Sequence, residues 1–224
     1  TMSVRGTMNK FGLMLIGVIA GAGYTWHLID QNNPSLAQTL MIVGVIGGLI
    51  TALAITFKPN WAPALAPAYA ILEGLFLGAI SKVFNDAFYP GIVVQAVGLT
   101  FGVAVAMFLL YNFRIIKPTE KFRSMIMSAT LGIAIFYLLT WVLGLFGVDV
   151  SFVRDNSMLS IGISLFIVAI AALNLILDFD MIEQGAERGA PKFMEWYAAF
   201  GLMVTIVWLY LEILRLLSKL SSRD

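Results

Sequence analysis

The chain has 224 residues, of which 60% are hydrophobic and 12% are charged, and its mean hydropathy is +0.90. A soluble domain of this length could not bury so much apolar surface in one core, so the composition indicates an integral membrane protein. The formal net charge is +1, with no basic block and no cysteine, which argues against a nucleic-acid partner and excludes disulfides and thiolate metal sites.

Seven apolar runs are each long enough to cross a bilayer, whose hydrocarbon core of about 30 Å takes about 20 helical residues. Short polar connections rich in proline, glycine and asparagine separate them. We therefore predict an all-α fold, a seven-transmembrane-helix bundle that forms one domain over residues 1–224, with the first run kept as a span rather than cleaved as a signal peptide. The runs are residues 11–29, 36–57, 61–80, 91–113, 125–147, 158–177 and 193–217.

The lysines and arginines of the connections predict the orientation. If all seven runs cross, nine of these residues fall on the side of the N-terminus and five on the other side, so we place the N-terminus in the cytoplasm. Three of those five lie in the C-terminal tail, so a re-entrant run would sharpen the bias to twelve against two.

Four runs contain the pattern Gly-x-x-x-Gly, which lets two helix backbones approach closely in lipid. We predict that these pairs are packing seams of the bundle. The pairs are Gly17 and Gly21, Gly44 and Gly48, Gly74 and Gly78, and Gly98 and Gly102.

Acidic residues in or beside the apolar runs are the main functional candidates, because a charge in hydrocarbon costs roughly 2.5 to 3.5 kcal/mol on insertion scales. Glu73 lies about halfway along the third run, where it should pair inside the bundle or stay protonated, and we predict a cation or proton site there. Asp178 and Asp180 follow the sixth run, and Asn174 shares a helix face with Asp178. The alternative for this acidic stretch is the hydrated end of a helix.

Other polar residues have simpler explanations. Glu195 opens the last run, where a negative charge is favourable at a helix N-terminus. Glu212 and Arg215 have the spacing of a helical ion pair, which we predict to be an interfacial clasp. His27, at the end of the first run, is predicted to be an interfacial residue rather than a proton relay.

The chain has no sequence motif of a known catalytic centre, whether nucleophile elbow, zinc motif or phosphate loop. Asp178 and Asp180 are two residues apart and point about 200° apart on one helix, which does not suit an aspartyl protease dyad. We therefore predict no enzyme activity, and no cofactor other than a calcium ion.

Four stretches resemble the transmembrane Bax inhibitor-motif family, most closely its bacterial branch, and the resemblance covers nearly all of the chain. It implies a bundle whose last helix runs up the centre of the other six, a pH-sensitive calcium leak, and a multi-pass location in a bacterial inner membrane. The stretches are YAILEGLFLG at 69–78, LDFDMIEQGAERGAP at 177–191, MEWYAAFG at 194–201 and LYLEILR at 209–215.

The resemblance also implies a gate made of two aspartates, on the sixth and seventh helices, that share a proton or hydrogen bond when closed. The first carries over to Asp178, but the second falls near Thr205, where this chain has no acid. Either Glu195 or Glu73 supplies the second carboxylate, or the pH gate is absent. A basic residue that some members carry after the second helix corresponds loosely to Lys58.

The predicted function is a pH-sensitive calcium or cation leak channel, with a pathway between the last helix and its neighbours. Asp178 and Asp180, with Lys58, would close it near the cytoplasmic end, and the same two aspartates are the predicted calcium ligands. Protons and calcium should compete for these carboxylates. The alternative is a non-conducting regulatory protein that binds other membrane proteins, such as a membrane-anchored protease, through its glycine-lined surface. A proton-coupled exporter is the third hypothesis.

Overall fold

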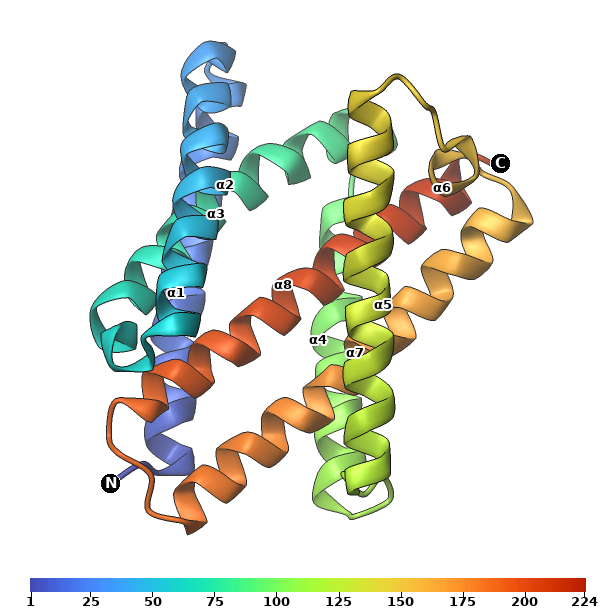
Figure 1. Ribbon diagram of the computed structural model, residues 1–224. Helices are drawn as coiled ribbons and strands as arrows, with labels where there is room; N and C mark the ends of the chain where they lie inside the picture. Colours follow the sequence, from blue (N-terminus) through green and yellow to red (C-terminus); the bar gives the residue numbers. More distant parts are fainter. The chain divides into compact units, whose positions relative to one another are not determined.

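The computed structural model describes residues 1–224, which form helices and no strand (Figure 1). Seven helices are long and apolar enough to cross a membrane, so the prediction of an all-α fold with seven spans is confirmed. They are α1 (Val4–Asp30), α2 (Pro34–Phe57), α3 (Ala62–Ala87), α4 (Ile92–Asn112), α5 (Glu120–Leu145), α7 (Met158–Glu187) and α8 (Met194–Ser221).

The helix ends follow local sequence signals. The hydroxyls of Ser3 and Thr119 accept hydrogen bonds from the backbone N–H groups at the starts of α1 and α5. Pro34 opens α2, where its missing N–H removes no helical hydrogen bond. Asn32, in the turn before it, has a φ of 54°, a left-handed conformation that asparagine tolerates better than most residues.

Helix α7 differs from the prediction, because it continues ten residues beyond the predicted end at 177. The apolar run ends there, but residues 178–187 are mostly good helix formers, and the next proline is Pro191. Asp178 and Asp180 therefore lie inside a helix and not at its end. Two short helices occupy connections that were predicted to be irregular: the 3₁₀ helix η1 (Pro59–Trp61) and α6 (Ser151–Arg154).

Large apolar side chains cover the outer surfaces of the spans. Ile16, Ile50 and Leu131 are each more than 60% exposed, and their neighbours on the same helix faces are also apolar. Such surfaces are stable only against hydrocarbon, so the helices contact a lipid bilayer and the protein is a multi-pass membrane protein.

The chain forms two compact units. The first comprises Thr1–Val93 and Asp180–Val204, and the second comprises Val94–Phe179 and Thr205–Asp224, so α7 and α8 each contribute to both. The single domain predicted for residues 1–224 stays a prediction. Burial is greatest in α8, where 56% of the most apolar window is buried against 11% in α5, and the central position predicted for the last helix stays a prediction.

In the first unit, α3 packs closely against both α1 and α2. A Cβ added to Gly74 of α3 would overlap the carbonyl of Val18 in α1. One added to Gly44 of α2 would lie 2.5 Å from the carbonyl oxygen of Leu72 in α3. Three of the four predicted Gly-x-x-x-Gly pairs therefore form packing seams, because at least one glycine of each pair lies too close to a neighbouring backbone for any side chain.

The fourth pair, Gly98 and Gly102 of α4, does not pack in this way. Both glycines are exposed, and nothing lies within 4 Å of a Cβ added to either one. Within the second unit this pair therefore forms no packing seam, and the seam predicted for it stays a prediction.

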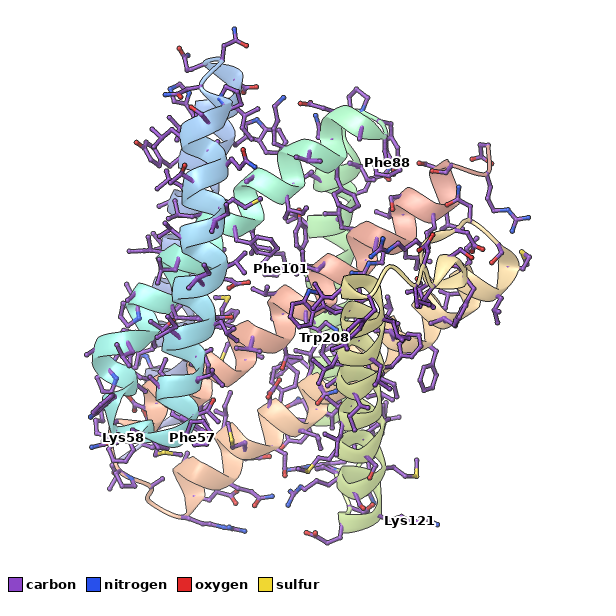
Figure 2. The ribbon with its side chains drawn as sticks, turned by 45° about the horizontal axis from the view of Figure 1, so that its top comes forward. Phe57, Lys58, Phe88, Phe101, Lys121 and Trp208 are labelled. Atoms are coloured by element: carbon purple, nitrogen blue, oxygen red, sulfur yellow. The ribbon has the colours of Figure 1, made fainter.

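The second unit has a core of branched apolar side chains. Ile126 and Ile133 of α5 pack with Ile167 and Ile170 of α7, and all four are buried. Trp208 of α8, which Figure 2 labels, packs against this cluster. The α5, α7 and α8 segments of this unit thus share one apolar core, and Tyr137, Asn174 and Asp178, described below, lie on the same helices.

Candidate functional site

Asp178 of α7 lies in the second unit and forms a hydrogen bond with the side chain of Thr205 in α8. Its other oxygen, Oδ2, is buried and accepts no hydrogen bond. Thr205 thus faces Asp178 at the position where the family resemblance places a second aspartate. Because a hydroxyl donates a hydrogen bond and carries no charge, this pair cannot share a proton as two carboxyls do.

Asn174, one turn before Asp178, extends the polar contacts from α7 to α5. Its side-chain amide donates to the hydroxyl of Thr130 in α5, at 2.8 Å, and to the carbonyl of Ile170, at 2.9 Å. Asn174 and Asp178 share a helix face, as the sequence predicts. The second unit therefore contains a short row of hydrogen-bonding groups inside an apolar core.

Glu73 lies near the middle of α3, in the first unit, and is half-buried. Its carboxylate is partly removed from solvent and makes no hydrogen bond and no ion pair. Gly48 of α2 makes room for it, because a Cβ there would lie 3.0 Å from Oε2 of Glu73. Within the first unit Glu73 has no ion-pair partner, and the cation or proton site predicted there stays a prediction.

Asp180, two residues after Asp178, is 6% exposed and accepts a hydrogen bond from the side-chain amide of Gln184, at 2.7 Å. Between the two aspartates, the ring of Phe179 packs edge-on against Phe108, with 5.5 Å between ring centres. No group of three or more His, Cys, Asp or Glu side chains lies close enough together to hold a metal ion. A calcium ion on Asp178 and Asp180 stays a prediction.

Glu195 opens α8, and its side chain is fully buried in the first unit. Oε1 accepts hydrogen bonds from the backbone N–H and hydroxyl of Ser3, at 2.9 and 3.0 Å, and from the ammonium of Lys192, at 2.8 Å. Oε2 forms an ion pair with Lys10 of α1. The carboxylate is therefore fully occupied in attaching the start of α1 to the start of α8. The sequence predicted that the negative charge of Glu195 would be favourable at the N-terminus of the last helix. It did not predict the ion pair with Lys10, which is 185 residues away.

Lys58 lies at the turn between α2 and η1, next to Phe57 (Figure 2). The side chain is exposed, and its ammonium lies 4.4 Å from the centre of the Trp61 ring. This geometry is a cation–π contact at an interfacial tryptophan. The gating role predicted for Lys58 stays a prediction.

Sequence reasoning missed a polar cluster that Tyr137 of α5 forms with the second half of α8. Its hydroxyl donates a hydrogen bond to Oε1 of Glu212, which is 2% exposed, and accepts one from Arg215 at 3.1 Å. Arg215 lies 3.8 Å from Oε2 of Glu212, which accepts no hydrogen bond. The predicted Glu212–Arg215 clasp is present. Tyr137, 75 residues from Glu212, gave no signal in the sequence.

The fold and these residues define a class of protein: an all-α, multi-pass membrane protein that buries isolated carboxylates within its spans. The family model for Bax inhibitor 1 like proteins matches residues 1–222, so the chain belongs to that family. The resemblance stated from the sequence is thereby confirmed. A comparison with curated protein sequences gives no match.

Proposed function

We propose that this protein is a pH-sensitive leak channel for calcium or other cations in a bacterial inner membrane, with its N-terminus in the cytoplasm. The observation that supports this most directly is the state of Glu73 and Asp178. Each lies within a membrane-spanning helix and has at least one carboxylate oxygen without a hydrogen bond. Buried polar groups are almost always hydrogen-bonded, so these two carboxyls are suited to binding something that moves.

A proton and a cation are the two species that such a carboxyl can take. The ionised form attracts a cation into the span, and the protonated form is neutral and releases it. Acidification and calcium should therefore compete at Asp178 and Glu73. Because Thr205 supplies a hydroxyl instead of a second carboxyl, we expect Asp178 to contribute one proton to the pH dependence of the flux, separate from the proton that Glu73 contributes.

Calcium flux into dye-loaded liposomes tests this proposal. We expect Asp178→Asn and Glu73→Gln each to lower the flux and flatten its pH dependence, because the amide can neither ionise nor take up a proton. Thr205→Asp should add a further proton to this pH dependence by restoring the shared-proton pair. Glu120→Gln is the matched control, since the Glu120 side chain is 92% exposed. Flux equal to that of empty vesicles, or unchanged in both variants, would contradict the proposal.

A non-conducting regulatory role is the second candidate, and the exposed glycines of α4 favour it. Gly98 and Gly102 would let the backbone of a partner helix approach α4 closely, and nothing lies within 4 Å of a Cβ added to either glycine. A regulatory binder should show no flux but should copurify with a membrane-protein partner, such as a membrane-anchored protease. Gly98→Leu should abolish that copurification while leaving the fold intact.

A further inference from the structure

Lys219 lies in the last turns of α8 and is only 5% exposed. A lysine near a helix end normally extends its long side chain toward water, and Arg223, one turn later, is exposed in this way. The ammonium of Lys219 instead turns inward against the start of α7. It donates to the hydroxyl of Ser164 at 2.8 Å and to the carbonyl of Ser160 at 3.5 Å.

Lys219 belongs to a polar face that repeats along the α7–α8 pair of the second unit. Asp178 faces Thr205, and fourteen residues away on each helix Ser164 faces Lys219. The two helices therefore run antiparallel in constant register, which places Glu212 at the level of Ala171, midway between these pairs. Each step of seven residues advances about 10.5 Å, so the polar positions span about 21 Å of the membrane.

The surroundings of the ammonium are those of a bound cation. Its direct ligands are a hydroxyl and a carbonyl oxygen, the neutral ligand types that hard cations take in proteins. Burial opposes the charge of the ammonium most strongly, Arg215 repels it, and the carboxylates of Glu212 and Asp155 attract it. The two oxygen ligands and the two carboxylates therefore have to compensate the ammonium for its lost hydration, and they would do the same for another cation in its place.

We propose that Lys219 is a tethered cation that occupies an oxygen-lined cation site between α7 and α8 and blocks that end of the polar face. A permeating ion has to displace the ammonium from Ser164. The blocking role rests on the proposed function, but occupancy of the site does not. The alternative is that Lys219 only complements the negative end of the α8 dipole, a role that leaves its replacement unable to bind ions.

Direct ion binding tests occupancy. In detergent, Lys219→Gln should gain a calcium- or potassium-dependent rise in melting temperature that the wild type lacks, and adding Ser164→Ala should remove it. Arg223→Gln is the matched control and should behave as the wild type. In the wild type itself, calcium should speed acylation of the Lys219 amine, followed by mass spectrometry, at least several-fold. Absence of both effects would overturn the proposal, and the acylation result decides alone if Lys219→Gln does not fold.

Flux separates this proposal from the proposed function. In calcium-dye liposomes, Lys219→Gln should conduct about tenfold faster than the wild type, and Lys219→Arg, which keeps the charge, should not. A wild type that conducts at the same rate as Lys219→Gln would refute the block and leave the leak channel intact. Absence of flux in every variant, together with calcium-dependent stabilisation of Lys219→Gln, would refute the channel and retain the site.

Discussion

Two carboxylates, Glu195 in the first unit and Asp178 in the second, are held in different ways. In the first unit, the carboxylate of Glu195 accepts hydrogen bonds and ion pairs from Ser3, Lys10 and Lys192. In the second unit, one oxygen of Asp178 and one of Glu212 have no hydrogen bond. A saturated carboxylate holds helices together, whereas an unsaturated one can exchange a proton or a cation. A carboxylate thus serves as an anchor at Glu195 and as a candidate ion site at Asp178, as it does at Glu73 in the first unit.

Removing the anchor should have the largest effect. We expect Glu195→Ala to lower the free energy of unfolding by about 3 kcal/mol, because Lys10 loses its partner while its side chain is only 18% exposed. Unfolding in mixed micelles, followed by circular dichroism, measures this change. Glu120→Gln is the control, because its ion pair with Arg123 is exposed and should contribute less than about 1 kcal/mol. Equal losses in the two variants would mean that Glu195 is not an anchor.

The glycine seams of the first unit should be the next most sensitive feature. A Cβ on Gly78 of α3 would overlap the backbone of Ala22 in α1, so we expect Gly78→Ala to cost about 2 kcal/mol of unfolding free energy. Gly102→Ala is the matched control in α4, where the added Cβ meets nothing. The same micelle assay should show no loss there, and a stable Gly78→Ala would contradict the close approach of α1 and α3.

The polar cluster of the second unit should respond less. Tyr137→Phe removes the hydrogen bond from its hydroxyl to Glu212 and the one that it accepts from Arg215. We expect a loss of about 1.5 kcal/mol, the lower end of the range for hydrogen bonds to charged groups. Tyr24→Phe, at a side chain that is 51% exposed, should leave the unfolding free energy unchanged. A loss as large as that of Glu195→Ala would mean that the cluster of Tyr137 and Glu212 anchors its helices as strongly as Glu195 does.

The smallest effect is expected in the connection before α7. Hydrogen bonds from the hydroxyl and N–H of Ser157, at 2.6 and 3.2 Å, hold the pKa of Asp155 below its ordinary value. These bonds stabilise the fold above the ordinary aspartate pKa and are lost as the pH falls through the lowered value. Ser157→Ala should raise the pKa of Asp155, measured by carboxyl carbon NMR. Ser151→Ala should leave it unchanged, and a pKa unmoved by Ser157→Ala would assign the shift to another group.

Much of the fold was predictable because membrane helices are encoded locally. Runs of apolar residues, short polar connections and four motif stretches were enough for seven spans and the family. The position opposite Asp178 was also predictable, since the family resemblance implies a gate residue on the last helix that falls near Thr205. The end of α7 was not, because hydropathy reports where a helix leaves the lipid and not where its hydrogen bonds end.

The sequence by itself determined the seven spans and placed Glu73 inside one of them. Only the tertiary structure decided how each charge is used: Glu195 is saturated by Lys10, Lys219 turns inward to Ser164, and Gly98 faces outward. The physical reason is the separation along the chain of the residues that interact. A helix depends on residues three and four apart, which any window of the chain displays, whereas the partners of a buried charge come from helices up to 192 residues away.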